Sequence, residues 1–463
     1  MTGIAGSFGP TGSGEVVTAM LRGLTHRGPD GASLSCGLLT PEGSAAIGHA
    51  RFDAVDRGSQ PVQGAGILVI DGELSGPEGP MDATALLKAL DLAWPEPETV
   101  LDALDGPYAM AYWRGQDVIL ARDPLGVRPL WYSLCTGLAF ASERQALEAV
   151  ELTHPLPLEP RSLLRYHVPS DRPDLVTRDV PWLAPDNDPL AKGHPPAERL
   201  ISLLTDSVAK RLAHRPPGPV GVLLSGGVDS TVVARLLMDA GADVRGYVAV
   251  LDEPGLKEAA DLEGAQRAAD HLGIPLHVER ATVGGVEALL PRLVPRVGHD
   301  ALVGVALALH LGFTAAHRDG VRVVFAGQGA DELFGGYARY RTVQDLAGAC
   351  RRDVLDLWRR DTLRDDLVAA GCSIALRTPF LDTEVVRFAL SLPDPLLRDG
   401  DVNKLVLRQA ASILGLPKEL ALRPKRAAQY GSRLDHAIAR LAKLAGVPRD
   451  EYLAQFVEGG QVH

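Results

Sequence analysis

The stretch that most restricts the fold is VLLSGGVDSTVVARLL, at residues 222–237. An apolar run typical of a buried strand leads into Gly226 and Gly227, and helical spacing begins near Asp229 or Ser230. A glycine-rich loop between a strand and a helix turns backbone N–H groups toward the positive end of the helix, where a phosphate binds well. The full string therefore predicts a phosphate-binding loop. The alternative is an ordinary turn capped by Ser230 or Asp229.

Strands and helices alternate around this loop, which predicts an α/β domain with a parallel sheet. The expected strands lie at 219–225, 244–251 and 321–327, and the expected helices at 230–241 and 256–273. Beyond residue 332 the spacing is mainly helical.

The first part of the chain has a different pattern. Short apolar runs separated by turn residues predict an α+β domain with antiparallel sheets, and one helix is expected over DATALLKALDLA at 82–93. Proline and charge are concentrated at 154–197 without helical spacing, which indicates a linker. Because 463 residues are too many for one ordinary core, we expect domains at 1–153 and 198–463.

Charge and cysteine content exclude some classes of protein. The 58 acidic and 47 basic residues give a formal net charge of -11, which argues against general nucleic-acid binding because phosphate neutralisation needs a basic surface. The 4 cysteines form no metal-binding or disulfide spacing. No signal peptide and no apolar span of membrane length appear, so we expect a cytoplasmic protein without membrane partners.

A second loop follows the expected strand at 321–327 and reads GQGADELFGGY. In a parallel sheet both loops emerge at the carboxyl ends of strands, where ligands bind. Asp229 and Asp331 are then candidates to hold one Mg²⁺ between them, because this ion prefers carboxylate and phosphate oxygens. Taken alone, each aspartate is also a suitable helix cap.

Cations are concentrated near the C-terminus of this acidic chain. They are Lys404, Arg408, Arg423, Lys425 and Arg426. Long cations on a helix usually form a solvated face. Lys425, between Pro424 and a run of small residues, is better suited to neutralise charge on a phosphoryl leaving group.

Several strings resemble one family along nearly the whole chain. SGGVDS, GQGADELFGGY, LRTPFLD and RPKRAAQYGS resemble the synthetase domain of the asparagine synthetase family, which has an ATP-pyrophosphatase (PP-loop) fold. TGIAG, HRGPDG, GHARF and LARDPLGVRPLWYS resemble the same family's glutaminase domain, which is of the N-terminal-nucleophile (Ntn) hydrolase type.

The resemblance implies a set of site residues and two cofactors, ATP and Mg²⁺. The phosphate loop would comprise Ser225, Gly226, Gly227, Asp229 and Ser230, and the adenosine would contact Leu224, Ala249 and Gly327. The magnesium ligands would be Asp229 and Asp331. The cations that face pyrophosphate and the adenylate would be Lys404 and Lys425. The implied reaction joins a substrate carboxylate to AMP, releases pyrophosphate and transfers the acyl group to ammonia or an amine. The protein contributes positioning and charge neutralisation.

The glutaminase half departs from the family at its nucleophile. The family has cysteine at the position of Thr2, and a hydroxyl is a far weaker nucleophile than a thiol unless a base activates it. Asp71 stands where the family has an asparagine in its oxyanion hole, and an anion there would repel the developing charge. The glutamine pocket would still comprise Arg51, Gly72, Glu73 and Asp82. We expect an inactive glutaminase, and the alternative is a slow reaction at Thr2.

The synthetase half departs as well. Gln328 replaces a family glutamate, and Ala375 occupies a position before Arg377 that is commonly glutamate. The base toward the attacking nitrogen is then unassigned, with Glu332 and Tyr337 as candidates. The segment 298–312, expected near the acceptor, is more apolar than an aspartate pocket needs.

Three functions therefore stay open. They are an amide ligase using ammonia or an amine, a specialised or intramolecular synthetase of the β-lactam-synthetase kind, and a catalytically silent binding homologue. The expected partners are small molecules, with a homodimer as the expected assembly.

Overall fold

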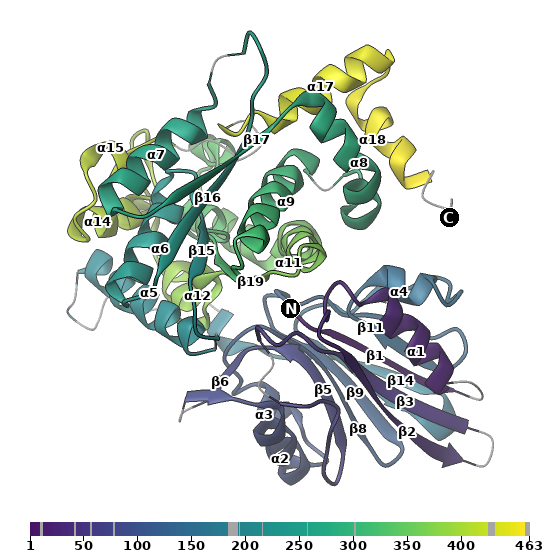
Figure 1. Ribbon diagram of the computed structural model, residues 1–463. Coiled ribbons are helices and arrows are strands. Elements are labelled where there is room, and N and C mark those ends of the chain that lie inside the picture. The colour runs from purple at the N-terminus through teal and green to yellow at the C-terminus, as the bar shows by residue number, and fades with distance from the viewer. Residues whose placement is uncertain are drawn as a thin grey trace. The chain divides into compact units, whose positions relative to one another are not determined.

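The computed structural model divides into two compact units (Figure 1). Unit 1 comprises Met1–Pro181 and Ala213–Pro216, and unit 2 comprises Trp182–Leu212 and Pro217–His463. The structure describes residues 1–9, 13–40, 43–55, 58–76, 79–183, 193, 195–214, 216–256, 258–300, 302–424 and 431–458. Every helix within these ranges is too short or too polar to span a bilayer.

Unit 1 is built from two six-stranded antiparallel sheets, in the orders β12-β10-β11-β1-β3-β2 and β14-β13-β9-β8-β5-β4. Their strands are β1 (Gly3–Gly9), β2 (Ala32–Thr40), β3 (Gly43–Ala50), β4 (Val62–Gln63), β5 (Ile67–Gly72), β8 (Tyr108–Arg114), β9 (Asp117–Arg122), β10 (Trp131–Ser133), β11 (Leu138–Ala141), β12 (Leu156–Pro157), β13 (Ser162–His167) and β14 (Arg172–Thr177). A short hairpin adds β6 (Leu74–Gly76) and β7 (Gly79–Met81).

The core of unit 1 lies between the sheets and is covered by helices on both sides. Phe8 of the first sheet meets Trp113 of the second edge to face, with ring centroids 5.3 Å apart. In β8 the odd-numbered residues join this central core and the even-numbered ones the core under α2, as the period of two in a strand requires. The helices are α1 (Ser13–Gly23), α2 (Ala83–Ala93), α3 (Glu98–Leu101) and α4 (Arg144–Glu148). The helix predicted at 82–93 is confirmed as α2.

The prediction of a linker at 154–197 is wrong over much of this segment, because β12, β13 and β14 lie in the sheets of unit 1. In β13, Leu163 points to one core and Leu164 to the other, although prolines and charges surround the strand. Pro173 is tolerated because β14 is an edge strand, where a missing donor costs no ladder bond. Residues 184–192 and 194 lie outside the described ranges.

Unit 2 contains a five-stranded, fully parallel sheet in the order β17-β16-β15-β18-β19. The strands are β15 (Val220–Leu223), β16 (Val244–Leu251), β17 (Leu276–Ala281), β18 (Val323–Phe325) and β19 (Ala375–Arg377). The longer helices are α5 (Pro196–Ala213), α6 (Val228–Asp239), α7 (Ala260–Leu272), α8 (Val283–Val297), α9 (Val303–Arg318), α11 (Leu346–Gly371), α12 (Thr383–Leu390), α14 (Leu405–Ile413), α17 (Leu434–Ala445) and α18 (Arg449–Glu458). The predicted parallel α/β class is confirmed here, as is the antiparallel α+β class of unit 1.

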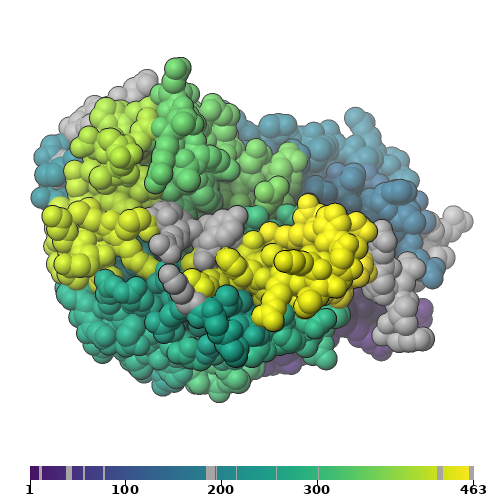
Figure 2. All heavy atoms as spheres, turned by 90° about the horizontal axis from the view of Figure 1, so that it is seen from above, coloured from purple at the N-terminus to yellow at the C-terminus, as the bar shows by residue number. Residues whose placement is uncertain are grey.

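Shorter elements complete unit 2. They include α10 (Ala330–Phe334), α13 (Asp394–Leu397), α15 (Lys418–Ala421) and the hairpin of β20 (Arg398–Asp399) and β21 (Val402–Asn403). The last two helices, α17 and α18, are yellow in Figure 2 and pack against α8. The carboxyl ends of β15 and β18 lead into the two loops that carry the candidate site.

Candidate active site

The loop between β15 and α6 has a backbone shape that depends on glycine. Gly226 has φ of 68°, and a Cβ at this position would lie 2.0 Å from the carbonyl carbon of Gly264. The Ser225 amide donates to Ser230 Oγ at 3.3 Å. Arg423 secures the loop from outside, because its guanidinium donates to the Ser225 carbonyl at 2.5 Å and to the Ala260 carbonyl at 2.6 Å. The sequence SGGVDS therefore forms a tight turn at the N-terminus of α6.

The second loop, after β18, comes directly against the start of α6. A Cβ on Gly327 would lie 2.8 Å from the Asp229 Cβ, so only glycine permits this approach. Lys404 Nζ lies 2.7 Å from Asp229 Oδ2 and 2.7 Å from Asp331 Oδ1. The lysine is buried, with 1% of its surface exposed. Both carboxylates therefore face a common point.

These two carboxylates supply two of the ligands that a divalent cation needs. In the described ranges, no group of three or more histidine, cysteine, aspartate or glutamate side chains is placed to hold a metal. Magnesium, however, keeps several waters and is commonly bound by one or two carboxylates together with substrate phosphates. Asp229 and Asp331 fit that arrangement, with the remaining ligands left to phosphate and water.

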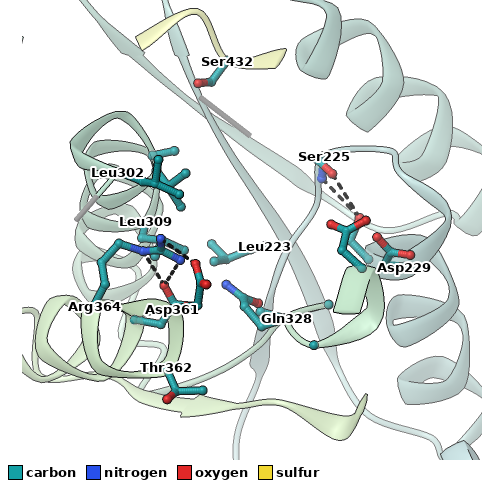
Figure 3. Close-up of a pocket in the computed structure, with 18 of the residues that line it drawn as sticks. Leu223, Ser225, Asp229, Leu302, Leu309, Gln328, Asp361, Thr362, Arg364 and Ser432 are labelled. Carbon is teal, nitrogen blue, oxygen red and sulfur yellow. Dashed lines mark hydrogen bonds and ion pairs between the residues drawn. The ribbon is translucent and has the colours of Figure 1, made fainter. Parts of the chain in front are cut away.

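A cavity of about 240 Å³ opens beside both loops (Figure 3). Its lining brings together most of the predicted nucleotide site: Leu224, Ser225, Asp229, Ser230, Ala249, Gly327 and Asp331. Lys404 lines a smaller adjoining cavity with Gly227, Arg408 and Arg423. Gly226 shapes the loop but lines neither cavity. Lys425 and Arg426 lie outside the described residues.

The far end of the cavity is formed by α9 and α11. The predicted apolar segment 298–312 contributes Leu302, Val305, Ala308 and Leu309. The charged residues of α11 were not predicted as site residues. Arg364 Nε donates to Asp365 Oδ1 at 2.8 Å, and its NH1 donates to Asp361 Oδ1 at 2.9 Å. The one sequence signal was the i, i+4 spacing of Asp361 and Asp365, which is equally typical of a solvated helix face.

Two carboxyl groups in this cavity have shifted pKa values. Burial raises the pKa of Glu332 to about 7, with a further contribution from Asp331. Burial also raises the pKa of Asp365 to about 6, against the opposing effect of Arg364. The Tyr337 hydroxyl donates to Glu332 Oε1, so the two candidate bases form one pair. Arg377 lies elsewhere and donates to the Arg211 carbonyl at 2.5 Å.

In unit 1, Thr2 belongs to a buried network of charges. Its amide and its hydroxyl both donate to Asp71 Oδ1 at 3.1 Å. Arg27 donates to Asp71 Oδ2 at 2.9 Å and to Glu143 Oε1 at 3.1 Å. Burial opposes ionisation of Asp71, but Arg128 and Arg27 outweigh it and hold the pKa of this carboxyl below its usual range. Asp71 is therefore an anion directly beside the Thr2 hydroxyl.

The other residues predicted for a glutamine pocket are not all gathered in one place. Gly72 and Asp82 line a cavity of about 270 Å³, whose described lining includes neither Thr2 nor Asp71. Asp82 is the N-cap of α2 and accepts from the Ala85 amide at 2.8 Å. Glu73 lies 3.5 Å from Arg128 NH2. Arg51 is exposed and pairs with Asp53 at 3.1 Å.

Comparison with known proteins adds an independent finding. The "Asparagine synthase" family model matches residues 199–346 and 340–453. The chain belongs to the asparagine synthase family. The "Glutamine amidotransferase domain" model matches residues 76–149 of unit 1. As a member of the asparagine synthase family, the chain is a carbon–nitrogen ligase that uses ATP.

Two asparagine synthetases show how far the similarity extends. The chain is 32% identical over 409 residues to the putative glutamine-hydrolysing asparagine synthetase 1 of Methanocaldococcus jannaschii, covering 75% of this chain and 73% of that protein. It is 26% identical over 447 residues to asparagine synthetase B of Escherichia coli, covering 87% and 76% respectively. Both matches extend over more than the synthetase half, in agreement with the two-domain resemblance.

Proposed function

We propose that the chain activates a substrate carboxylate with ATP and converts it into an amide with ammonia or an amine. The observation that carries the proposal is the position of Asp229 and Asp331, which face one point beside the SGGVDS loop and its cavity. Attack at the α-phosphate needs such a combination of phosphate contacts and negative ligands for a cation. The family membership supports the same reaction class.

In the proposed reaction, a substrate carboxylate oxygen bonds to the α-phosphorus of ATP and pyrophosphate leaves. The amine nitrogen then bonds to the acyl carbon, AMP leaves, and the nitrogen loses a proton. The loop from Ser225 to Ser230 holds the phosphates, and Leu224, Ala249 and Gly327 contact the adenosine. Lys404 and Lys425 neutralise the leaving groups. Asp229 and Asp331 would hold Mg²⁺, which adds positive charge at the phosphates when bound.

Product analysis tests this assignment. With α-labelled ATP, Mg²⁺ and an accepted carboxylate, we expect AMP and pyrophosphate in equal amounts, because the carboxylate attacks the α-phosphorus. Thin-layer chromatography of the label and an enzymatic pyrophosphate assay measure the two products. Formation of ADP and inorganic phosphate instead would reject the proposal.

For residues 1–153 we propose a glutaminase-like domain that has lost glutamine hydrolysis. Where the family has cysteine and asparagine, this chain has Thr2 and Asp71. The hydroxyl of Thr2 donates to a carboxylate that two arginines keep ionised. A negative charge beside the nucleophile disfavours a second negative charge on a tetrahedral intermediate.

We therefore predict no measurable release of glutamate from glutamine, and amide formation that responds to ammonium or an amine but not to glutamine. Losing stabilisation of the oxyanion costs about two to three orders of magnitude in rate. Glutamate release should be compared for wild type, Thr2→Ala and Thr2→Cys, with removal of Met1 checked by mass spectrometry. Release by wild type that disappears in Thr2→Ala would show that Thr2 is a working nucleophile.

A specialised or intramolecular synthetase is the second candidate. The apolar lining from α9 favours it, because aspartate and ammonia need no such surface. The two intact loops argue against a catalytically silent homologue. Cytoplasmic location and homodimer formation stay predictions from the sequence.

A further inference from the structure

We infer that the acceptor end of the cavity takes a monocarboxylate with an apolar body and a cationic amino group, in preference to an amino acid with a second carboxylate. This inference rests on the proposed function. The acceptor end comprises Gln328, Glu332 and the residues that line the cavity from α11 and from α9 with its N-cap. From the N-cap and α9 these are Leu302, Val305, Ala308 and Leu309, and from α11 they are Leu357, Asp361, Thr362, Arg364 and Asp365.

One wall of the acceptor end is apolar. Figure 3 shows Leu302 and Leu309 on the side of the cavity away from Ser225 and Asp229, with Leu223 between the two sides. Val305 and Ala308 continue the wall along α9. A methylene chain gains free energy by leaving water for such a surface, whereas the short side chain of aspartate gains little.

The cation at this end is already engaged. Arg364 is the one cationic side chain among the described residues that line the cavity. Its Nε and NH2 lie 2.8 and 2.7 Å from Asp365 Oδ1, and its NH1 lies 2.9 Å from Asp361 Oδ1. All three nitrogens thus bind carboxylates of the same helix. Two carboxylates thus already offset the positive charge of the guanidinium, so a substrate carboxylate that approaches its other N–H groups gains little net attraction.

The remaining charge at the acceptor end is acidic. Arg364 faces two carboxyl groups, those of Asp361 and Asp365, and Glu332 lines the same cavity. Asp361 is the more accessible of the two carboxylates that pair with Arg364, with its side chain 29% exposed against 4% for Asp365. A second carboxylate brought here loses hydration beside like charges, which is unfavourable. An ammonium group is attracted instead and can donate to Asp361.

Four probe acids distinguish these alternatives in ATP–pyrophosphate exchange with the full chain. Hexanoate, 6-aminohexanoate and adipate have similar chain lengths and differ at the far end, and L-aspartate is the fourth probe. We expect kcat/KM for 6-aminohexanoate to exceed that for adipate by about tenfold or more, with hexanoate between them and aspartate below hexanoate. Equal or higher kcat/KM for adipate or aspartate would overturn the inference.

Variants test whether the charge at the acceptor end causes the preference. Asp361→Asn should reduce the preference for 6-aminohexanoate over adipate, and Val305→Lys should shift it toward adipate by about tenfold. Asp356→Asn is the matched control, because Asp356 is on the same helix with its side chain 71% exposed and pairs with Arg359. It should leave the ratio unchanged. A ratio that is the same in all three variants would overturn the inference.

Calorimetric binding of the same probes, with α,β-methylene ATP present, separates the two proposals. Binding in the expected order without exchange by any acid would reject the proposed function and retain the inference about the pocket. Exchange that favours aspartate or adipate would reject the inference and retain the proposed function. Binding of none of the four probes would overturn the inference.

Discussion

Replacing Asp229 or Asp331 by asparagine will lower Mg²⁺-dependent ATP cleavage by about two orders of magnitude or more. Each change removes one of the two negative charges that face a common point, and an amide oxygen is a weaker ligand for a hard cation than a carboxylate. The Mg²⁺ concentration needed for half-maximal rate should rise at the same time. Initial rates of pyrophosphate release across a Mg²⁺ titration measure both effects.

Asp239→Asn is the control for this experiment. Asp239 ends the same helix, α6, with its side chain 44% exposed, and it pairs with Arg235 on the surface. Its replacement should leave the rate and the Mg²⁺ dependence unchanged. A wild-type rate and Mg²⁺ dependence in either site variant would remove that aspartate from the metal site.

Replacing Lys404 by methionine will lower the free energy of unfolding of unit 2 by about 3–5 kcal/mol in the absence of Mg²⁺. The ammonium group is buried within 2.7 Å of two carboxylates whose side chains are only 11% and 13% exposed, and its loss leaves both without this cation. Urea unfolding with hydrogen–deuterium exchange of the α6 and α10 peptides reports on unit 2 alone.

Lys418→Met is the matched control, because Lys418 is exposed at the start of α15, and it should change the unfolding free energy by less than about 0.5 kcal/mol. If the two aspartates bind Mg²⁺, added Mg²⁺ should stabilise Lys404→Met more than wild type, because the ion replaces the lost charge. A loss in Lys404→Met no larger than that in Lys418→Met would contradict the prediction.

Elements with strong local patterns were predicted well from the sequence. The strand predicted at 244–251 is β16, Val244–Leu251, which is a run of apolar residues buried on both faces. Helix α6 begins at Val228, one residue before the earliest predicted start, because Gly227 is its N-cap. In these segments the hydrophobic spacing and the glycine positions agree with the tertiary packing.

Other elements depend on partners that a local pattern does not reveal. β17, with the sequence LHVERA, was not predicted, because it is a half-exposed edge strand whose alternation is weak. β13 and β14 lie in the segment predicted as a linker because prolines and charges dominate its composition. Pairing of β13 with β9, and of β14 with β13, determines the structure instead.

The same distinction holds in the candidate site. The glycine-rich loops and Asp229 could be located from spacing alone. Arg364 and Asp365 could not, because their sequence, LRDD, is also what a solvated helix face looks like. Their burial follows from the packing of α11 against α9, which is a tertiary contact. The apolar residues of α9 were noted in the sequence, but their position opposite the phosphate loop comes from the fold.

The position of Lys404 has a consequence for nucleotide turnover. An ammonium group within the fold serves as an internal counterion for Asp229 and Asp331, so one of their two negative charges is offset between catalytic cycles. A divalent cation arriving with a nucleotide competes with this ammonium for the same oxygens. The net affinity of the metal is then the difference between two attractions, which is smaller than its own attraction to the two carboxylates. Such an exchange of counterions favours release of the metal and pyrophosphate after each reaction.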